Sequence, residues 1–476
     1  MKKSRLAPLI VSLALLLPLD TSVADDSHSS LEECKIKNVE ISNPLRVGWP
    51  KFPGLIRPEG SPSFLVVGVD FEDAPMSALE TNLIRSSLQL DRITDRYKYV
   101  SEGKFSPAFE VYPHWVRMPE QSSHYGQSRN QIEFIDDEWT THHIMHDLML
   151  LLKDSVNFKK YSGVIILVPG GKALSGTAAY ATVLDKSLAN EFSEGVQNYI
   201  VVGGSLISQG EVNPWQVIVH EINHLLGLPD LYLYETDGDW KAKTPGPFGQ
   251  QAFVYESSSD SLAWNRWLNS WIPDEQVTCL DKVEDVFTQF MSPPNDSDPA
   301  GSQLLLIPLN ESKVLAIESL NPKGYVGVTY FNSLLVYTVD TSIKIGEGPV
   351  RIIPRPTSLT LAPLTPSLPD WKRFVEAPLI PGSYVEYEDF LIINEAQEKN
   401  GSRLTIYRGK SAIDKKRELE QPNKKEIASD ENLDLPPQKT TILCVKGKTK
   451  KRVNAISPNC PKGFVFTRVL PSKDKS

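Results

Sequence analysis

The sequence contains no apolar run long enough to cross a membrane as a helix. The strongest candidate, residues 6–19, is interrupted by Pro and Ser and is shorter than the roughly 20 residues that a spanning helix needs. Because basic residues precede this run and Ser22-Val23-Ala24 follows it, residues 1–24 match a signal peptide cleaved after Ala24. We therefore expect an exported protein without a membrane span, either extracellular or held at the cell surface.

Positive charge is also in deficit, with 50 Lys and Arg residues against 59 Asp and Glu. The resulting formal net charge of −9 argues against nucleic acid as the main partner. With 40% hydrophobic and 23% charged residues, the 476-residue chain can form two or three domains with ordinary cores.

Cysteine is scarce, and the four in the chain are Cys34, Cys279, Cys444 and Cys460. An even number of cysteines in an exported protein favours disulfides, and four allow three pairings. We expect Cys444–Cys460 to close a short local loop and Cys34–Cys279 to tie distant segments together.

The first half of the chain contains two regions that differ in composition and pattern. Residues 25–60 are rich in Pro, Gly and polar residues without clear periodicity, and they are a candidate for a removable propeptide. Residues 61–290 alternate strand-like and helix-like patterns, which is typical of the α/β or α+β classes, and we take α+β as the expectation. The expected buried strands are at 64–71, 164–168 and 200–202, and the expected helices are at about 79–97 and 131–152.

The second half of the chain has a different sequence pattern. Residues 300–408 contain short strand-like runs separated by Gly, Pro and Asn, which predicts an all-β, sandwich-like domain. Residues 409–441 contain no Phe, Trp or Tyr and many charged residues, which predicts a disordered linker. Residues 442–476 form a small cassette that the Cys444–Cys460 bond is expected to close.

The clearest chemistry lies in residues 213–232. Asn213 can cap a helix and Pro214 suits its first turn, where a missing N–H costs nothing. On that helix His220 and His224 are four residues apart, so both imidazoles project from one face towards one ion. Two solvated histidines on an exposed helix are the alternative. The apolar flanks of the motif disfavour it, because they predict a buried helix and buried histidines need partners.

The residues around the two histidines complete a metal site. Glu221, beside the first imidazole, can reach a water held by the metal without binding the metal itself. Gly227 can end the helix with a positive φ, and Asp230 then returns as an oxygen ligand. Zinc accepts nitrogen and oxygen ligands tetrahedrally, and three protein ligands leave the fourth position for water. The pattern predicts Zn²⁺ held by His220, His224 and Asp230.

This motif resembles that of a known family. His220-Glu221-x-x-His224-x-x-Gly227-x-x-Asp230-Leu231-Tyr232 is similar to the motif of the immune inhibitor A-like peptidases, the M6 family, and looser similarity covers residues 45–408. The resemblance implies a zincin-like catalytic domain with an HExxH active-site helix. It also implies a secreted zinc endopeptidase acting on proteins or peptides. By it, His220, His224 and Asp230 would hold the metal and Glu221 would be the general base.

One position departs from the family pattern. Such peptidases usually place a Met-containing turn beneath the zinc, but no Met occurs between Met149 and Met291. Gln251 stands where that Met is expected, and we expect its side chain to pack below the ligands without proton chemistry. The departure keeps a second function open, a catalytically weak or inactive cell-surface binding or adhesion protein on a peptidase scaffold. The intact Glu221 favours the enzyme.

Three further patterns have more than one interpretation. Asp237-Gly238-Asp239 has the oxygen-rich composition of a Ca²⁺ loop but lacks the full spacing, so an ordinary turn is the alternative. Cys34 could block the metal as a thiolate in a latent form if it were not in a disulfide. Tyr232 or Tyr234 could donate to an oxyanion, or could simply pack.

The C-terminal cassette is strongly basic, with nine Lys or Arg residues and one Asp from Cys444 to Ser476. Its sequence resembles a small C-terminal element of exported actinobacterial proteins. Contact with an anionic cell-wall polymer is one interpretation, and a solvated end without a partner is the other.

Overall fold

The computed structural model divides into two compact units, Met1–Lys416 and Arg417–Ser476, and mixes helices with several sheets. Each unit is described by itself. The described residues are 31–40, 43–52, 56–75, 87–125, 141–168, 179–183, 196–203, 214–234, 245–252, 261–282, 285–320, 333–355, 377–398, 400–421, 440–446, 449–455, 461–462 and 465–470. The predicted signal peptide at residues 1–24, Asp237–Asp239 and Cys460 lie outside them.

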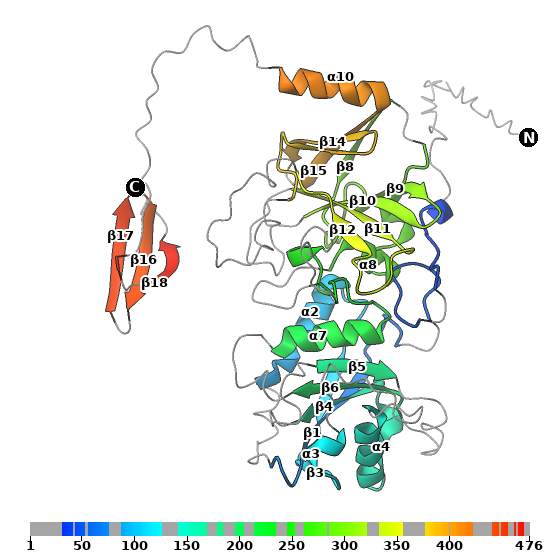
Figure 1. The fold of residues 1–476 in the computed structure, drawn as a ribbon, viewed down its shortest axis with the longest axis vertical. Coiled ribbons are helices and arrows are strands. Elements are labelled where there is room, and N and C mark those ends of the chain that lie inside the picture. The colour runs from blue at the N-terminus through cyan, green and yellow to red at the C-terminus, as the bar shows by residue number, and fades with distance from the viewer. Residues whose placement is uncertain are drawn as a thin grey trace, which may run out of the picture. The chain divides into compact units, whose positions relative to one another are not determined.

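A six-stranded sheet organises the N-terminal half of the first unit, in the order β2-β1-β4-β6-β5 with β3 also paired to β1 (Figure 1). The central strands are parallel and buried on both faces, so their sequences are nearly continuous apolar runs. The strands predicted from those runs are confirmed. The bounds are β1 Ser63–Asp70, β2 Ala108–Val111, β3 Val116–Arg117, β4 Gly163–Val168, β5 Ala179–Val183 and β6 Asn198–Gly203.

Helices cover both faces of this sheet (Figure 1). Alternate side chains of each strand point to opposite faces, so Leu65 and Val67 pack towards α4 (Thr141–Leu152). Phe64 and Val66 pack in the other core with α2 (Leu90–Val100) and α7 (Pro214–Leu225). The short helix α3 (Ser122–Tyr125) also contributes to the α4 side.

Two further sheets form the β-rich part of the first unit. One has the order β12-β11-β10-β9-β7 and the other β13-β14-β15-β8, and side chains from both share one core. The strands predicted in this part are confirmed. β7 and β8 precede residue 300, so this part begins earlier than the predicted start at 300. The bounds are β7 Val277–Cys279, β8 Val286–Met291, β9 Leu304–Asn310, β10 Lys313–Ser319, β11 Leu334–Asp340, β12 Val350–Ile352, β13 Tyr384–Tyr387, β14 Phe390–Glu398 and β15 Gly401–Arg408.

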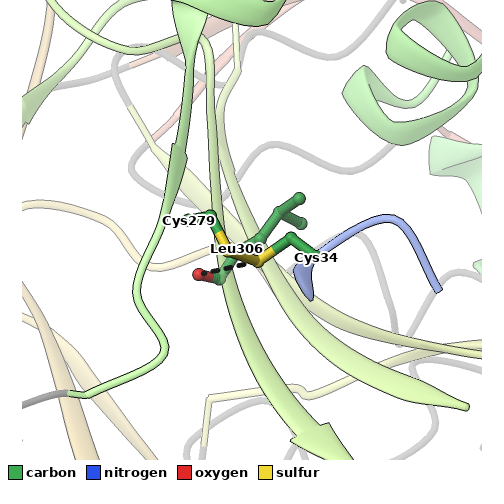
Figure 2. The surroundings of a disulfide bond; sticks show 3 residues. All are labelled: Cys34, Cys279 and Leu306. Carbon is green, nitrogen blue, oxygen red and sulfur yellow. Dashed lines mark hydrogen bonds between the residues drawn. A yellow bond between two sulfur atoms is a disulfide. The ribbon is translucent and has the colours of Figure 1, made fainter. Parts of the chain in front are cut away.

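The N-terminal segment packs on the outer face of the five-stranded sheet. Ile36 and Val47 share a buried core with α8 (Ala263–Leu268) and with side chains of β9, β10 and β11. The predicted Cys34–Cys279 disulfide is confirmed, with a Cα–Cα distance of 5.9 Å (Figure 2). The described part of residues 25–60 is therefore covalently tied into the β-rich core.

The predicted linker is wrong at its start, because residues Gly409–Glu420 form helix α10. Ala412 packs on Leu391 and Ile393 of β14, and Lys416 pairs with Glu386 at 2.8 Å. Unbranched charged residues are good helix formers, so the composition that argued for disorder also suits a helix with one docked face. Residues 422–439 of the predicted linker lie outside the described residues.

The second unit contains a three-stranded antiparallel sheet of order β17-β16-β18. Its strands are β16 Thr440–Lys446, β17 Thr449–Ala455 and β18 Val465–Leu470. Cys444 lies on β16, but its predicted partner Cys460 falls outside the described ranges, so that disulfide stays a prediction. Over the described residues as a whole, none of the helices has the length and apolar character to cross a membrane.

Candidate metal centre

Helix α7 positions three of the sequence-predicted site residues. Its apolar side, including Ile218 and Ile222, packs on the six-stranded sheet. His220 and His224 are one turn apart, and their rings meet edge to face with centroids 4.7 Å apart. The buried Glu221 is the next residue after the first histidine.

The end of α7 turns the chain back towards these imidazoles. Gly227 has a φ of 93°, a conformation that glycine adopts without steric cost. Its N–H donates to the carbonyl of His224 at 2.8 Å, and the N–H of Leu228 donates to that of Asn223 at 2.9 Å. This is the Schellman arrangement that ends a helix sharply. The turn places Asp230 against the histidines, as the sequence predicted.

The three predicted ligand side chains converge. Nε2 of His220 lies 2.9 Å from Oδ1 of Asp230 and 3.1 Å from Nε2 of His224. Nε2 of His224 lies 3.3 Å from the same Oδ1. Among the residues described, this is the one group of His, Cys, Asp or Glu side chains close enough to hold a metal ion together.

Backbone carbonyls orient both imidazoles. Nδ1 of His220 lies 3.2 Å from the carbonyl oxygen of Gln250, and Nδ1 of His224 lies 2.7 Å from that of Leu228. A carbonyl oxygen only accepts, so each Nδ1 carries the hydrogen. In the neutral form of each imidazole the lone pair is therefore on Nε2 and faces the convergence point, the form that a metal ligand needs.

The floor of the site is polar where the family pattern expects methionine. The buried side chain of Gln251 accepts a hydrogen bond from Asn223 Nδ2 at 2.9 Å, and its main-chain oxygen accepts from Leu231 N–H at 3.0 Å. Its Nε2 lies 3.4 Å from Nδ1 of His224. Gln251 does lie below the ligands, but the expectation that it only packs is wrong. It ties α7 to the segment that carries Asp230.

The charges of the site act on one another strongly. Burial lowers the pKa of His224, but the hydrogen bond and charge of Asp230 and the charge of Glu221 outweigh it and raise that pKa to about 9. Burial raises the pKa of Asp230, but hydrogen bonds from the two imidazoles hold it well below its usual range. Because the charge of Glu221 acts on the pKa of His224, these two side chains are close to one another.

Two tyrosines follow Asp230, the third predicted ligand. The ring of Tyr232 stacks on that of His220 with centroids 6.3 Å apart. The hydroxyl of Tyr234 donates to Oδ2 of Asp230 at 2.9 Å. The sequence suggested only oxyanion donation or packing for these residues. A hydrogen bond to a ligand was missed, although the spacing of four residues from Asp230 was visible.

Comparisons with known proteins add little to this geometry. No family model matches the sequence, and no curated protein matches it. Among solved structures, the crystal structure of wild type OgpA from Akkermansia muciniphila is similar at a TM-score of 0.26 and 13% sequence identity, over 63% of this chain and 93% of that one. At that TM-score the likeness carries no argument about fold or function.

Proposed function

We propose that the protein is a secreted zinc-dependent endopeptidase, with His220, His224 and Asp230 as metal ligands and Glu221 as the general base. The observation that carries the proposal is the convergence of two imidazole Nε2 atoms and one carboxylate oxygen beside a buried glutamate. The HExxH helix α7, packed on a mixed sheet, supports a zincin-like arrangement.

The donor set suits zinc. Tetrahedral ligands that lie roughly 2.0–2.1 Å from zinc are about 3.3–3.4 Å from one another. The three separations here, 2.9, 3.1 and 3.3 Å, need only a slight expansion to match. Two imidazoles and one carboxylate favour zinc over Mg²⁺ or Ca²⁺, which prefer oxygen ligands. Three protein ligands leave a fourth position for water or substrate.

The chain supplies the proton transfers. Zinc, when bound, polarises the scissile carbonyl and lowers the pKa of a water molecule to about 7. Glu221 is buried next to His220, so as a carboxylate it can accept the proton of the attacking water. The same carboxyl group can then deliver that proton to the leaving amine.

A peptide substrate fits the neighbouring sheet edge. β5 is the outer strand of its sheet, runs antiparallel to β6, and lies beside α7 (Figure 1). In the part of the chain that the structure describes, the edge of β5 away from β6 has no strand paired to it. An extended peptide can add to such an edge by main-chain hydrogen bonds, which bind without a strict side-chain requirement.

Replacing Glu221 with Gln tests the proposal. Glu221→Gln keeps the shape of the side chain but cannot accept the proton. It should bind one zinc per chain and lose peptide hydrolysis by about 10²–10⁴-fold. Metal analysis and rates on a mixed peptide library at neutral pH, after removal of any propeptide, measure both. The control is Glu275→Gln, an exposed glutamate in η5 (Asp274–Gln276), which should change neither.

Equal, background rates in zinc-loaded wild type and Glu221→Gln would contradict the peptidase proposal. The surface-binding protein on a peptidase scaffold would then be the better account. The polar floor at Gln251 is the observation that keeps this second function in view.

A further inference from the structure

The β-rich part of the first unit contacts the segment that carries the third ligand. The turn between β11 and β12, residues 341–349, lies beside residues 233–234. Leu233 and Glu347 form an antiparallel bridge, and the N–H of Tyr234 donates to the carbonyl of Gly346 at 3.0 Å. The chain that leaves Asp230 is therefore hydrogen-bonded to a turn more than one hundred residues away.

Tyr234 lies between this turn and Asp230. Tyr234 is 56% exposed, so burial alone does not fix the position of its ring. The ring lies against Gly346, where an added Cβ would be only 2.2 Å from Cδ2 of Tyr234. Any side chain larger than hydrogen at residue 346 would therefore displace the ring.

The hydroxyl of Tyr234 binds one carboxylate oxygen of Asp230, and the other oxygen faces the imidazoles. Oδ2 accepts from Tyr234 at 2.9 Å, while Oδ1 faces the two imidazole Nε2 atoms. A hydrogen bond to the outer oxygen restrains rotation of the carboxylate and leaves one oxygen for the ion. Removing such a partner typically weakens metal binding about 10–100-fold.

We propose that Tyr234 is a positioning residue for the metal centre and that the turn at 341–349 holds it in place through Gly346. The β-rich part thereby sets the affinity and geometry of the site. The inference rests on the proposed zinc site, but it assigns a role to residues outside the motif.

Two variants test the contact between Tyr234 and Gly346, and each changes one of the two residues. Tyr234→Phe keeps the ring on Gly346 and removes only the hydroxyl. Gly346→Ala keeps the hydroxyl and pushes the ring away. Both should raise the zinc dissociation constant by about 10–100-fold and alter the visible absorption spectrum of the Co²⁺-substituted protein. Neither readout depends on peptide hydrolysis.

Gly382→Ala is the matched control. Gly382 has a φ of 79°, close to the 83° of Gly346, but a Cβ built there meets no atom within 4 Å. Both alanine variants carry the same backbone strain, which thermal unfolding will record. Only Gly346→Ala should weaken zinc binding. In a Tyr234→Ala background, Gly346→Ala should cause no further loss of zinc affinity, because the ring that it displaces is gone.

The outcomes separate this inference from the proposed function. If wild type binds zinc and the Tyr234→Phe and Gly346→Ala proteins bind it equally well, the positioning role is wrong and the zinc site stands. If Gly346→Ala weakens binding as much in the Tyr234→Ala background as alone, the turn does not act through Tyr234. If purified wild type binds no zinc at all, both are wrong.

Discussion

Main-chain carbonyls decide which nitrogen of each candidate ligand faces the proposed metal site. Those of Gln250 and Leu228 accept from the two Nδ1 atoms, so the neutral form of each imidazole is the tautomer that zinc requires. The residues behind these carbonyls contribute position and not side-chain chemistry. The binding geometry therefore depends on two loops, at 249–252 and 226–230, keeping their places relative to α7.

A buried amine elsewhere in the first unit predicts an unusual pH dependence. Lys51 is partly buried and donates to Asn269, and burial lowers its pKa to about 7 from 10.5. Between pH 10.5 and 7 the unfolded chain gains a proton that the folded chain does not. The folded state is therefore penalised increasingly as pH falls towards 7. Lys51→Met should raise the melting temperature at pH 7, with a gain that shrinks as pH approaches 10.5.

Lys35 is a control for Lys51, because its pKa is shifted in the opposite direction. The hydrogen bond from Lys35 to Glu32 raises its pKa against some burial, with help from Asp274. Its contribution to stability is present below its unfolded pKa of 10.5 and is lost only at higher pH. Lys35→Met should therefore lower the melting temperature slightly at pH 7. If the gain in melting temperature of Lys51→Met stayed constant from pH 7 to 10.5, the lowered pKa assigned to Lys51 would be contradicted.

At the scale of residues, the sequence predicts which side chains converge but not which groups orient them. The spacing of His220, Glu221, His224 and Asp230 is enough to bring them together, because a helix and one glycine turn fix the geometry. The carbonyls of Gln250 and Leu228 have no sequence signature, since every residue has one. The role of Tyr234 depends on Gly346, and no local pattern connects two such distant positions.

At the scale of elements, the turn that ends α7 determines where Asp230, the third proposed ligand, lies. Gly227→Ala would place a Cβ at a φ of 93°, which costs about 1–2 kcal/mol of stability for a residue with a side chain. Relief of that strain should move Asp230 away from the imidazoles. The variant should lose stability and also bind zinc more weakly, as unfolding curves and zinc titration would show.

Gly103 follows helix α2 with a φ of 80°, and a Cβ there meets no atom within 4 Å. Gly103→Ala should therefore lose similar stability with unchanged zinc affinity. Equal zinc affinities for the Gly227→Ala and Gly103→Ala proteins would show that the turn does not position Asp230.

Elements were predictable where burial on both faces made their sequences uniformly apolar. β1, β4 and β6, and β9 to β11, belong to this class. Shorter strands such as β7 and β12 were not predicted, because three residues carry too little periodicity. α10 was missed for a different reason: its single buried residue, Ala412, leaves a composition that also suits disorder.

At the scale of the whole first unit, the N-terminal segment joins the β-rich part to helix α7. Trp49 packs edge-on against Trp264 and Trp267 of α8. The N–H of Arg46 donates to the carbonyl of Gly227 at 2.9 Å, and that of Ile56 donates to the carbonyl of Leu225 at 3.0 Å. Carbonyls at a helix end otherwise lack partners, so this segment completes the end of α7. Local sequence could not predict such contacts, because both partners are main-chain atoms.

The Cys34–Cys279 disulfide fixes the start of this segment, so removing the disulfide should affect zinc binding at the proposed metal centre. The two cysteines are 245 residues apart, and a loop of that length stabilises the folded state by about 5 kcal/mol in the chain-entropy account. Replacing both with Ala should lower the unfolding midpoint in urea, and it should weaken zinc binding because the segment then holds the end of α7 less firmly. Replacing Cys444 and Cys460 with Ala, in the other unit, should leave zinc binding unchanged. An unaltered midpoint and zinc affinity in the Cys34→Ala/Cys279→Ala protein would show that the segment holds its position without the covalent tie.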